Sequence, residues 1–308
     1  MDPYNRDGGY GNRPQGSGIG GRLLVALAIA AVGLFMYWNQ VQVNPVTGEK
    51  QHVAISPEQE IRLGLESAPQ MSQEMGGEVP ETDPRAREVQ EMGNYLVTHT
   101  KAANSPWKFK FHLLADDQTV NAFALPGGQI FITLGLYKRL QSEAQLAGVL
   151  SHEMGHVIER HSAQQMAKNQ LGQLMVVAVG TAASDNGMSR TSSPAMIAAL
   201  VNQMIQLRYS RGDESEADRW GLMLMTQSGY DPRAMVEVMQ ILKEATGKGD
   251  GRAPEMFATH PDPDLRIKQI EEYLKTHPPG KDLKEGNALP QGGGTGSKRL
   301  TWQDIFGG

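Results

Sequence analysis

The chain has 308 residues, a formal net charge of −5 and no cysteine. The length fits one large domain or two small ones. Without cysteine there can be no disulfides, thiolate metal sites, thiol nucleophiles or lipid anchors on cysteine, so any metal site must be built from His, Asp and Glu. The acidic balance argues against nucleic acid as a partner.

Glycine is concentrated at the two ends of the chain. Seven of the 35 glycines lie in residues 1–21 and eight lie in residues 280–308. Polar segments of this composition bury too little apolar surface to fold. We therefore expect a flexible leader over 1–21 and a flexible tail over 280–308.

An apolar segment follows the leader over residues 22–38, which read RLLVALAIAAVGLFMYW. A bilayer span needs about 20 residues. The segment reaches this length when it is counted from Ile19 and when Arg22 extends its charge to the headgroups. Tyr37 and Trp38 at its end suit the aromatic belt at a membrane surface. We predict an uncleaved transmembrane anchor over 22–38.

The basic residues around the anchor set its orientation. Arg6, Arg13 and Arg22 precede the apolar run, and the next basic residue is Lys50. Positive charge stays on the cytoplasmic side. We expect a single-pass protein of a bacterial inner membrane with its N-terminus in the cytoplasm and the remaining chain in the periplasm. A cleaved signal peptide is the alternative, although residues 35–40 lack the small residues of a cleavage site.

Beyond the anchor, residues 39–56 predict an extended linker with turns, and a folded domain is expected over 57–279. Apolar spacing and capping residues predict helices starting at Ser56, over 84–103, 143–161, 195–209 and 212–228, from Asp231 to about 245, and ending before Pro278. Alternating polarity predicts strands over 107–113, 122–125 and 129–133, the last two forming a hairpin. The expected fold class is α+β, mostly helical with one small sheet.

A second apolar run covers residues 174–183. It is too short to span a membrane. We expect a buried helix close to the functional site, and the alternative is a segment that touches lipid.

Residues 151–156 read SHEMGH and contain the pattern HExxH. In a helix, His152 and His156 lie one turn apart on the same face, where two imidazoles can bind one zinc ion. Glu153 can reach a water on that zinc and act as general base. A pair of histidines on a solvated helix face is the alternative.

A catalytic zinc needs a third protein ligand. The pattern HExxHxxGxxH would supply a histidine, but Glu159 and Ser162 occupy its glycine and histidine positions. His161 is one residue out of register, so we expect an ordinary surface or packing role for it.

A carboxylate from a later helix is the other solution. Glu214 and Asp218 are four residues apart and share a helix face. Glu214 can then bind zinc while Asp218 accepts a hydrogen bond from a ligand imidazole. Glu216 lies about 200° around the helix and is expected in solvent. A charged helix start that only compensates the helix dipole is the alternative.

HExxH at 152–156 and ExxAD at 214–218 together resemble the membrane-linked zinc metallopeptidases related to the CAAX prenyl endopeptidase and HtpX. Residues 121–128 and the late Thr259-His260-Pro261 segment agree with this family. The resemblance covers about residues 57–275 and is closest to the periplasmic BepA-like and mitochondrial inner-membrane quality-control subgroup. It implies a zincin-like (gluzincin) domain, one zinc ion per chain and Glu214 as the third ligand.

The resemblance also assigns roles to two late residues. In this family the histidine that matches His260 lies near the metal and occupies the open coordination position in a resting form. His260 or Arg266 is then expected to stabilise the oxyanion together with zinc. The single long apolar segment differs from the several spans of the prenyl endopeptidase and HtpX, which argues against prenylated substrates.

Substrate binding is expected at a strand edge, where an extended peptide adds through its backbone. The edge of 122–125 or of 129–133 can serve, through Ala124, Gln129, Ile130 and Phe131. Such recognition suits unfolded or misassembled envelope and membrane proteins, so we expect a quality-control endopeptidase. The alternatives are a membrane-anchored metal-binding chaperone or assembly factor and an interaction protein with a fortuitous HExxH. The oligomeric state stays open.

Overall fold

The computed structural model describes residues 19–183, 208–247 and 255–291. Its helices are α1 Ile19–Asn39, α2 Pro57–Glu74, α3 Pro84–Thr98, the 3-10 helix η1 Lys101–Asn104, α4 Leu134–Tyr137, α5 Glu143–Ile158, α6 His161–Ala183, α8 Arg211–Gln227, α9 Ala234–Gly247, α10 Glu255–Thr259 and α11 Pro263–Thr276. Its strands are β1 Val41–Val43, β2 Lys50–His52, β3 Lys110–Leu114, β4 Ala122–Leu125 and β5 Gln129–Thr133. The expected mostly helical α+β fold is confirmed.

Some expectations fall partly outside the described residues. The leader is described only from residue 19, and of the expected helix over 195–209 only residues 208 and 209 are described, in non-helical conformation. The first part of the expected flexible tail is packed on the domain, because Ala288 forms a bridge with Ser142 and Leu289 is buried.

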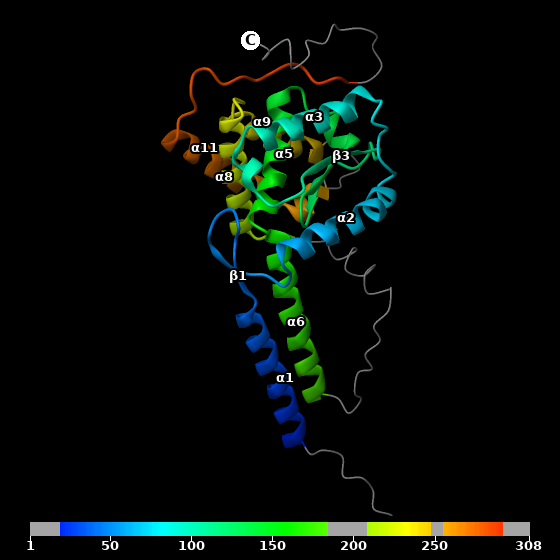
Figure 1. The fold of residues 1–308 in the computed structure, drawn as a ribbon, viewed down its shortest axis with the longest axis vertical. Helices are drawn as coiled ribbons and strands as arrows, with labels where there is room; N and C mark the ends of the chain where they lie inside the picture. The colour runs from blue at the N-terminus through cyan, green and yellow to red at the C-terminus, as the bar shows by residue number, and fades with distance from the viewer. Residues whose placement is uncertain (1–18, 184–207, 248–254, 292–308) are drawn as a thin grey trace, which may run out of the picture.

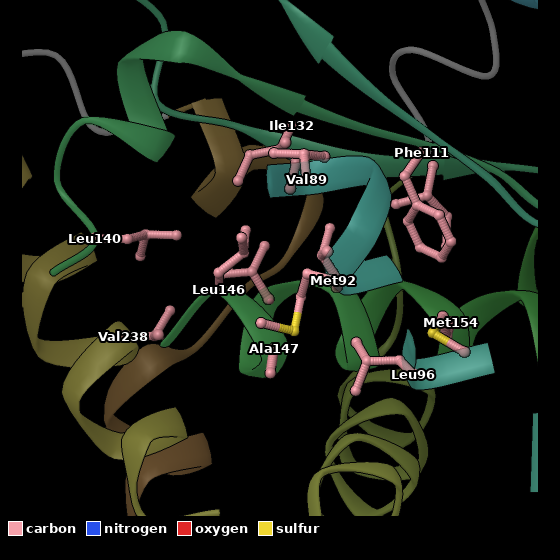
Figure 2. Packing of buried hydrophobic residues seen from close by; sticks show 14 of the residues in the cluster. Val89, Met92, Leu96, Phe111, Ile132, Leu140, Leu146, Ala147, Met154 and Val238 are labelled. Atoms are coloured by element: carbon pink, nitrogen blue, oxygen red, sulfur yellow. The ribbon is translucent and has the colours of Figure 1, made fainter. Parts of the chain in front are cut away.

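Helix α5 is the centre of the domain. All 16 of its residues are buried, so other parts of the domain surround it on every side, where the sequence predicted one apolar stripe. Ser142 caps its N-terminus through a hydrogen bond to the backbone of Gln145. Figure 2 shows the packing: Val89 and Met92 of α3, Ile132 of β5 and Leu146 of α5 converge on one core.

Helix α8 packs closely along α5, and a glycine in the HExxH motif makes this possible. A Cβ on Gly155 would lie 2.8 Å from the carbonyl oxygen of Ala217. Only a residue without a side chain lets the two backbones approach this far. The close approach brings the acidic residues of α8 next to the histidines of α5.

The three-stranded sheet has the order β3-β5-β4, with β3 parallel and β4 antiparallel to β5. The predicted hairpin of β4 and β5 is confirmed, but β5 is the central strand and is buried throughout. The proposal of Gln129, Ile130 and Phe131 as part of an exposed edge is therefore wrong, because both sides of β5 are already paired. Strand β4, with Ala124, remains an edge of this sheet.

The segment expected as a linker is tied to the domain. Strands β1 and β2 pair as an antiparallel hairpin. Asn44 is buried in its turn and donates a hydrogen bond to the carbonyl of Ile158 at the end of α5, 2.8 Å away. Gln51 likewise donates to the carbonyl of Glu159. The hairpin thus fixes helix α1 to the end of the central helix.

Arg160 separates α5 from α6. Its backbone adopts the left-handed conformation, with φ of 59°, which ends α5 and redirects the chain. Its side chain is 1% exposed and donates a 2.7 Å hydrogen bond to the buried Glu60 of α2. The same guanidinium donates to the carbonyl of Ile55. One buried cation therefore joins α2, the segment before it and the turn between α5 and α6.

Helix α6 does not have the buried position expected for residues 174–183. It leaves the domain and lies beside α1 (Figure 1). The side chains of Val176 and Val179 are 72% and 70% exposed. The expectation of a buried helix near the site is therefore wrong, and the reason is that the apolar run packs on another apolar helix instead of on the core. Of the described helices, α1 is long and apolar enough to cross a membrane over Gly20–Asn39.

We expect the substitution Arg160→Met to lower the free energy of unfolding by about 3–5 kcal/mol, because it leaves the Glu60 carboxylate buried without its cation. Urea unfolding of the detergent-solubilised chain, followed by circular dichroism, measures the change. The double variant with Glu60→Met should recover most of the loss, since it removes the buried charge as well. An unchanged unfolding midpoint for Arg160→Met alone would contradict the assignment.

Candidate metal centre

Three parts of the chain bring the candidate site residues together. Helix α5 supplies His152, Glu153 and His156, and α8 supplies Glu214 one turn into a capped helix. His260 follows α10, and its backbone N–H bonds back to the carbonyl of Met256. All five of these site side chains are buried. Residues 108 positions apart in the chain thus meet inside the domain.

The nitrogen and carboxylate atoms of His152, His156, Glu214 and His260 form the ligand cluster, in which one ligand atom of each residue lies within 4.8 Å of the others. The two Nε2 atoms of His152 and His156 are 3.1 Å apart, and each is 3.5 Å from a carboxylate oxygen of Glu214. A tetrahedral zinc with ligands at about 2.0–2.1 Å separates its donor atoms by about 3.3 Å. The three side chains therefore fit one zinc ion.

Asp218 orients His152. Its Oδ1 is 2.9 Å from Nδ1 of His152, which places the proton on Nδ1 and leaves Nε2 free for the metal. This is the arrangement expected from the spacing of Glu214 and Asp218. The side chain of Arg266, from α11, donates to both oxygens of Asp218 at 2.6 and 2.8 Å and lies 2.8 Å from Glu214.

The guanidinium of Arg266 is therefore committed to two carboxylates. Burial alone would raise the pKa of Glu214, but the charges of His260 and Arg266 outweigh it and hold this pKa well below its usual range. Glu214 is thus kept ionised, as a metal ligand must be. The geometry assigns Arg266 to the support of Glu214 and Asp218, whereas the sequence interpretation aimed it at the substrate.

Glu153 is in a different environment from Glu214. Its side chain is fully buried, and neither carboxylate oxygen has a hydrogen-bond partner among the described residues. Burial raises its pKa, against the opposing charges of His260 and His152. A carboxylate with a raised pKa and free oxygens beside a metal site is suited to accept and return a proton.

A second chain of hydrogen bonds orients His156, and the sequence interpretation missed it. Nδ1 of His156 lies 2.9 Å from Nδ1 of His161, whose Nε2 lies 3.2 Å from Glu216. The Glu216 carboxylate fixes the proton of His161 on Nε2. Nδ1 of His161 then accepts a hydrogen bond from Nδ1 of His156, and this leaves Nε2 of His156 free for the metal. The expected surface role for His161 is wrong, because its side chain is buried and contacts a candidate ligand. Glu216 is 41% exposed, as expected of a residue directed to solvent, but its carboxylate also bonds to His161.

The reason lies in the turn at Arg160. The periodicity of a continuous helix would carry His161 away from His156, but α5 ends before it and the left-handed residue turns His161 back. Tyr209, just before α8, adds a third contact, because its ring stacks on His156 with centroids 3.9 Å apart and its hydroxyl meets Ser162 at 3.1 Å. Neither contact has a sequence signal of its own.

The fold and this cluster define a zincin-type metallopeptidase, with HExxH on a buried helix and a glutamate from a later helix. The family model "Peptidase family M48" matches residues 83–279, which is more than half of the chain, and the chain therefore belongs to peptidase family M48. The expected family, enzyme class and zinc cofactor are confirmed by this match together with the ligand cluster.

Two kinds of curated protein are similar to the chain. The "Beta-barrel assembly-enhancing protease" of Yersinia pestis is 32% identical over 203 residues, which cover 62% of this chain and 40% of that protein. The "Mitochondrial metalloendopeptidase OMA1" of Schizosaccharomyces pombe is 29% identical over 248 residues, 80% of this chain and 70% of that protein. The "Beta-barrel assembly-enhancing protease" of Escherichia coli K12 is 32% identical over 186 residues, which cover 58% of this chain and 37% of that protein. The chain thus spans about two fifths of the assembly-enhancing proteases.

We expect His161→Ala and Glu216→Gln to weaken zinc binding about 10- to 100-fold, because each removes a partner that fixes the ring of His156. Competition with a chelating dye measures the affinity, and circular dichroism checks the fold. Glu272→Gln, at an exposed carboxylate of α11, is the matched control. Unchanged zinc affinity in both folded variants would show that the chain of hydrogen bonds does not act on the metal.

Proposed function

We propose that the chain is a zinc-dependent endopeptidase that hydrolyses peptide bonds in unfolded or misassembled membrane and envelope proteins. The proposal rests on one observation: the buried site holds two carboxyl groups, Glu214 and Glu153, whose pKa values are shifted in opposite directions. Glu214 is held ionised among cations, whereas Glu153 has no hydrogen-bond partner among the described residues, lies 3.7 Å from Nε2 of His260 and has a raised pKa. One is suited to hold a metal and the other to move a proton.

His152, His156 and Glu214 would hold the zinc ion. Bound there, zinc supplies a Lewis acid that polarises a carbonyl and makes water more acidic. Glu153 takes a proton from the water that attacks the scissile carbonyl, and it returns this proton to the amine that leaves when the C–N bond breaks. Asp218 and the His161–Glu216 pair keep the two histidines in the tautomers that this role needs.

His260 bears on how the site is opened. Its Nδ1 is 3.0 Å from Glu214 and 3.3 Å from Nε2 of His152, so it completes a set of four protein ligands. Structural zinc sites have four protein ligands, whereas catalytic sites keep one position open. We assign the described arrangement to a closed state, from which His260 must withdraw before a substrate carbonyl can enter.

Strand β4 is the proposed docking edge. It packs against α5 and pairs with β5 on one side only among the described strands. A peptide that adds to this edge next to Ala124 is bound through its backbone, and this binding does not depend on its sequence. Such binding supports unfolded chains as substrates, as does the similarity to proteases named for β-barrel assembly.

Helix α1 is the proposed membrane anchor. Its 20-residue span has a mean hydropathy of 1.8, and only 11% of it is buried in the structure. Together with the basic leader, this supports a single pass through a bacterial inner membrane with the catalytic domain on the periplasmic side. The anchor would keep the protease among the membrane and envelope proteins that it acts on.

A metal-binding chaperone or assembly factor is the second candidate, and the four-ligand arrangement with His260 favours it. A site closed by four side chains can stabilise a fold without catalysis. The two candidates differ in whether proteolysis depends on Glu153.

We expect Glu153→Gln to lower casein degradation at least about 100-fold, because the proton acceptor is lost, while the protein still binds one equivalent of zinc. Rates of peptide release and metal analysis of the purified full chain measure the two properties. Chelation of the metal should abolish activity and added zinc should restore it. Equal rates for Glu153→Gln and the unaltered chain would favour the chaperone.

We expect His260→Ala to open one coordination position without loss of the metal. The visible absorption spectrum of the cobalt-substituted protein should change, and a peptide hydroxamate, which binds the metal directly, should bind more tightly. Glu153→Gln is the control, since it alters no ligand. An unchanged cobalt spectrum would show that His260 is not a ligand in the closed state.

A further inference from the structure

Helices α1 and α6 form a matched antiparallel pair. Gly33 of α1 has no side chain, and a Cβ at this position would lie 3.3 Å from Cβ of Leu174 and 3.6 Å from Leu171. Nearer the domain, the side chains of Gln40 and Gln170 share a 3.0 Å hydrogen bond. Figure 1 shows the two helices leaving the domain together. These contacts fix the level of each helix relative to the other.

Both helices change from polar to apolar at this same level. Residues 161–170 of α6 read HSAQQMAKNQ, and residues 171–179 read LGQLMVVAV with no charge. Gln40, the residue after α1, closely follows the Tyr37-Trp38 pair that ends the apolar run of this helix. The Gln40–Gln170 bond therefore marks a common boundary, at the position where the aromatic residues of a span meet the headgroups.

Within the part of the chain that the structure describes, the outer side of the apolar part of α6 is exposed. Val176 and Val179 are 72% and 70% exposed, whereas Ala178 is 5% exposed and belongs to the packed side. Both helices rise by the same distance per residue from the contact at Gly33. Residues 176–179 of α6 therefore lie level with about residue 28 of α1, in the middle of the candidate span. Neighbouring side chains of α1 are exposed to a similar extent, with Leu24 and Phe35 both at 70%.

We propose that α6 enters the lipid bilayer beside α1, so that residues 171–179 contact acyl chains and the two helices form one membrane hairpin. The proposal rests on the membrane anchor of the proposed function and adds a second membrane element to it. A glycine at the contact, such as Gly33, is typical of helices that associate in lipid. The polar first half of α6 stays outside the bilayer, which is why the whole helix does not qualify as a span.

This insertion sets the distance between the metal centre and the membrane. From Gln170 at the boundary to His161 at the metal centre is nine residues of helix, or about 14 Å. His161 contacts the candidate ligand His156 directly. The peptide bond that is cleaved must then lie close to the membrane surface. The substrates that fit are extended segments next to a transmembrane helix or lipid-bound chains.

The absence of cysteine from the chain allows a direct test. Single cysteines replace Val176 and Val179 on α6, Phe35 on α1 and Glu272 on α11 in the full chain, and each carries a nitroxide label. Electron paramagnetic resonance in bilayer discs of phosphatidylethanolamine and phosphatidylglycerol measures collision with oxygen, which is enriched in lipid, and with a water-soluble nickel complex. All four sites are exposed, so the labels should be tolerated.

We expect the ratio of oxygen to nickel accessibility at Val176 and Val179 to match that at Phe35 and to be severalfold higher than at Glu272. A ratio at Val176 and Val179 equal to that at Glu272, with Phe35 in lipid, would overturn the insertion of α6 and leave the anchor intact. A ratio at Phe35 as low as that at Glu272 would overturn both the insertion of α6 and the membrane anchor α1. The measurement is independent of Glu153, so loss of proteolysis and loss of insertion are separately detected.

Discussion

The metal centre depends on one buried guanidinium. Glu214 and Asp218 project from the same face of α8 into a region without solvent, where two carboxylates would repel each other and lose their hydration. Arg266 reaches both of them from α11 and compensates both charges. The cation thereby keeps Glu214 ionised for a metal and Asp218 ionised for His152. The last described helix is consequently as necessary to the site as the HExxH helix.

Helix α8 supplies the acidic residues that the histidines of α5 need. Its residues supply the third candidate ligand, Glu214, and also the two carboxylates that orient the histidines, Asp218 directly and Glu216 through His161. The close approach at Gly155 allows all three interactions at once. A change in the separation of these two helices would alter ligand position and ligand tautomer together. The chemistry of the site therefore depends directly on the packing of α5 on α8.

The local parts of the site could be predicted from the sequence, because spacing within a helix fixes which side chains share a face. This holds for His152 with His156 and for Glu214 with Asp218. The missed parts depend on pairing between distant strands and on a backbone turn that helical periodicity does not reveal. The position of β5 between β3 and β4 comes from parallel pairing across the chain, and the role of His161 follows from the left-handed turn at Arg160. The apolar run of α6 gave no sign that its partner would be α1, more than a hundred residues earlier.

The scattered origin of the site also determines when it can exist. His152 lies 114 residues before Arg266, and His260 is nearly as late. A ribosome makes α1, the strands and the HExxH helix long before α11, and a domain made in this order cannot close its core until the last helix arrives. While the chain is being synthesised, Glu214 therefore lacks the guanidinium that compensates its charge. The candidate ligands and the cation that compensates them can therefore come together only after α11 has been synthesised.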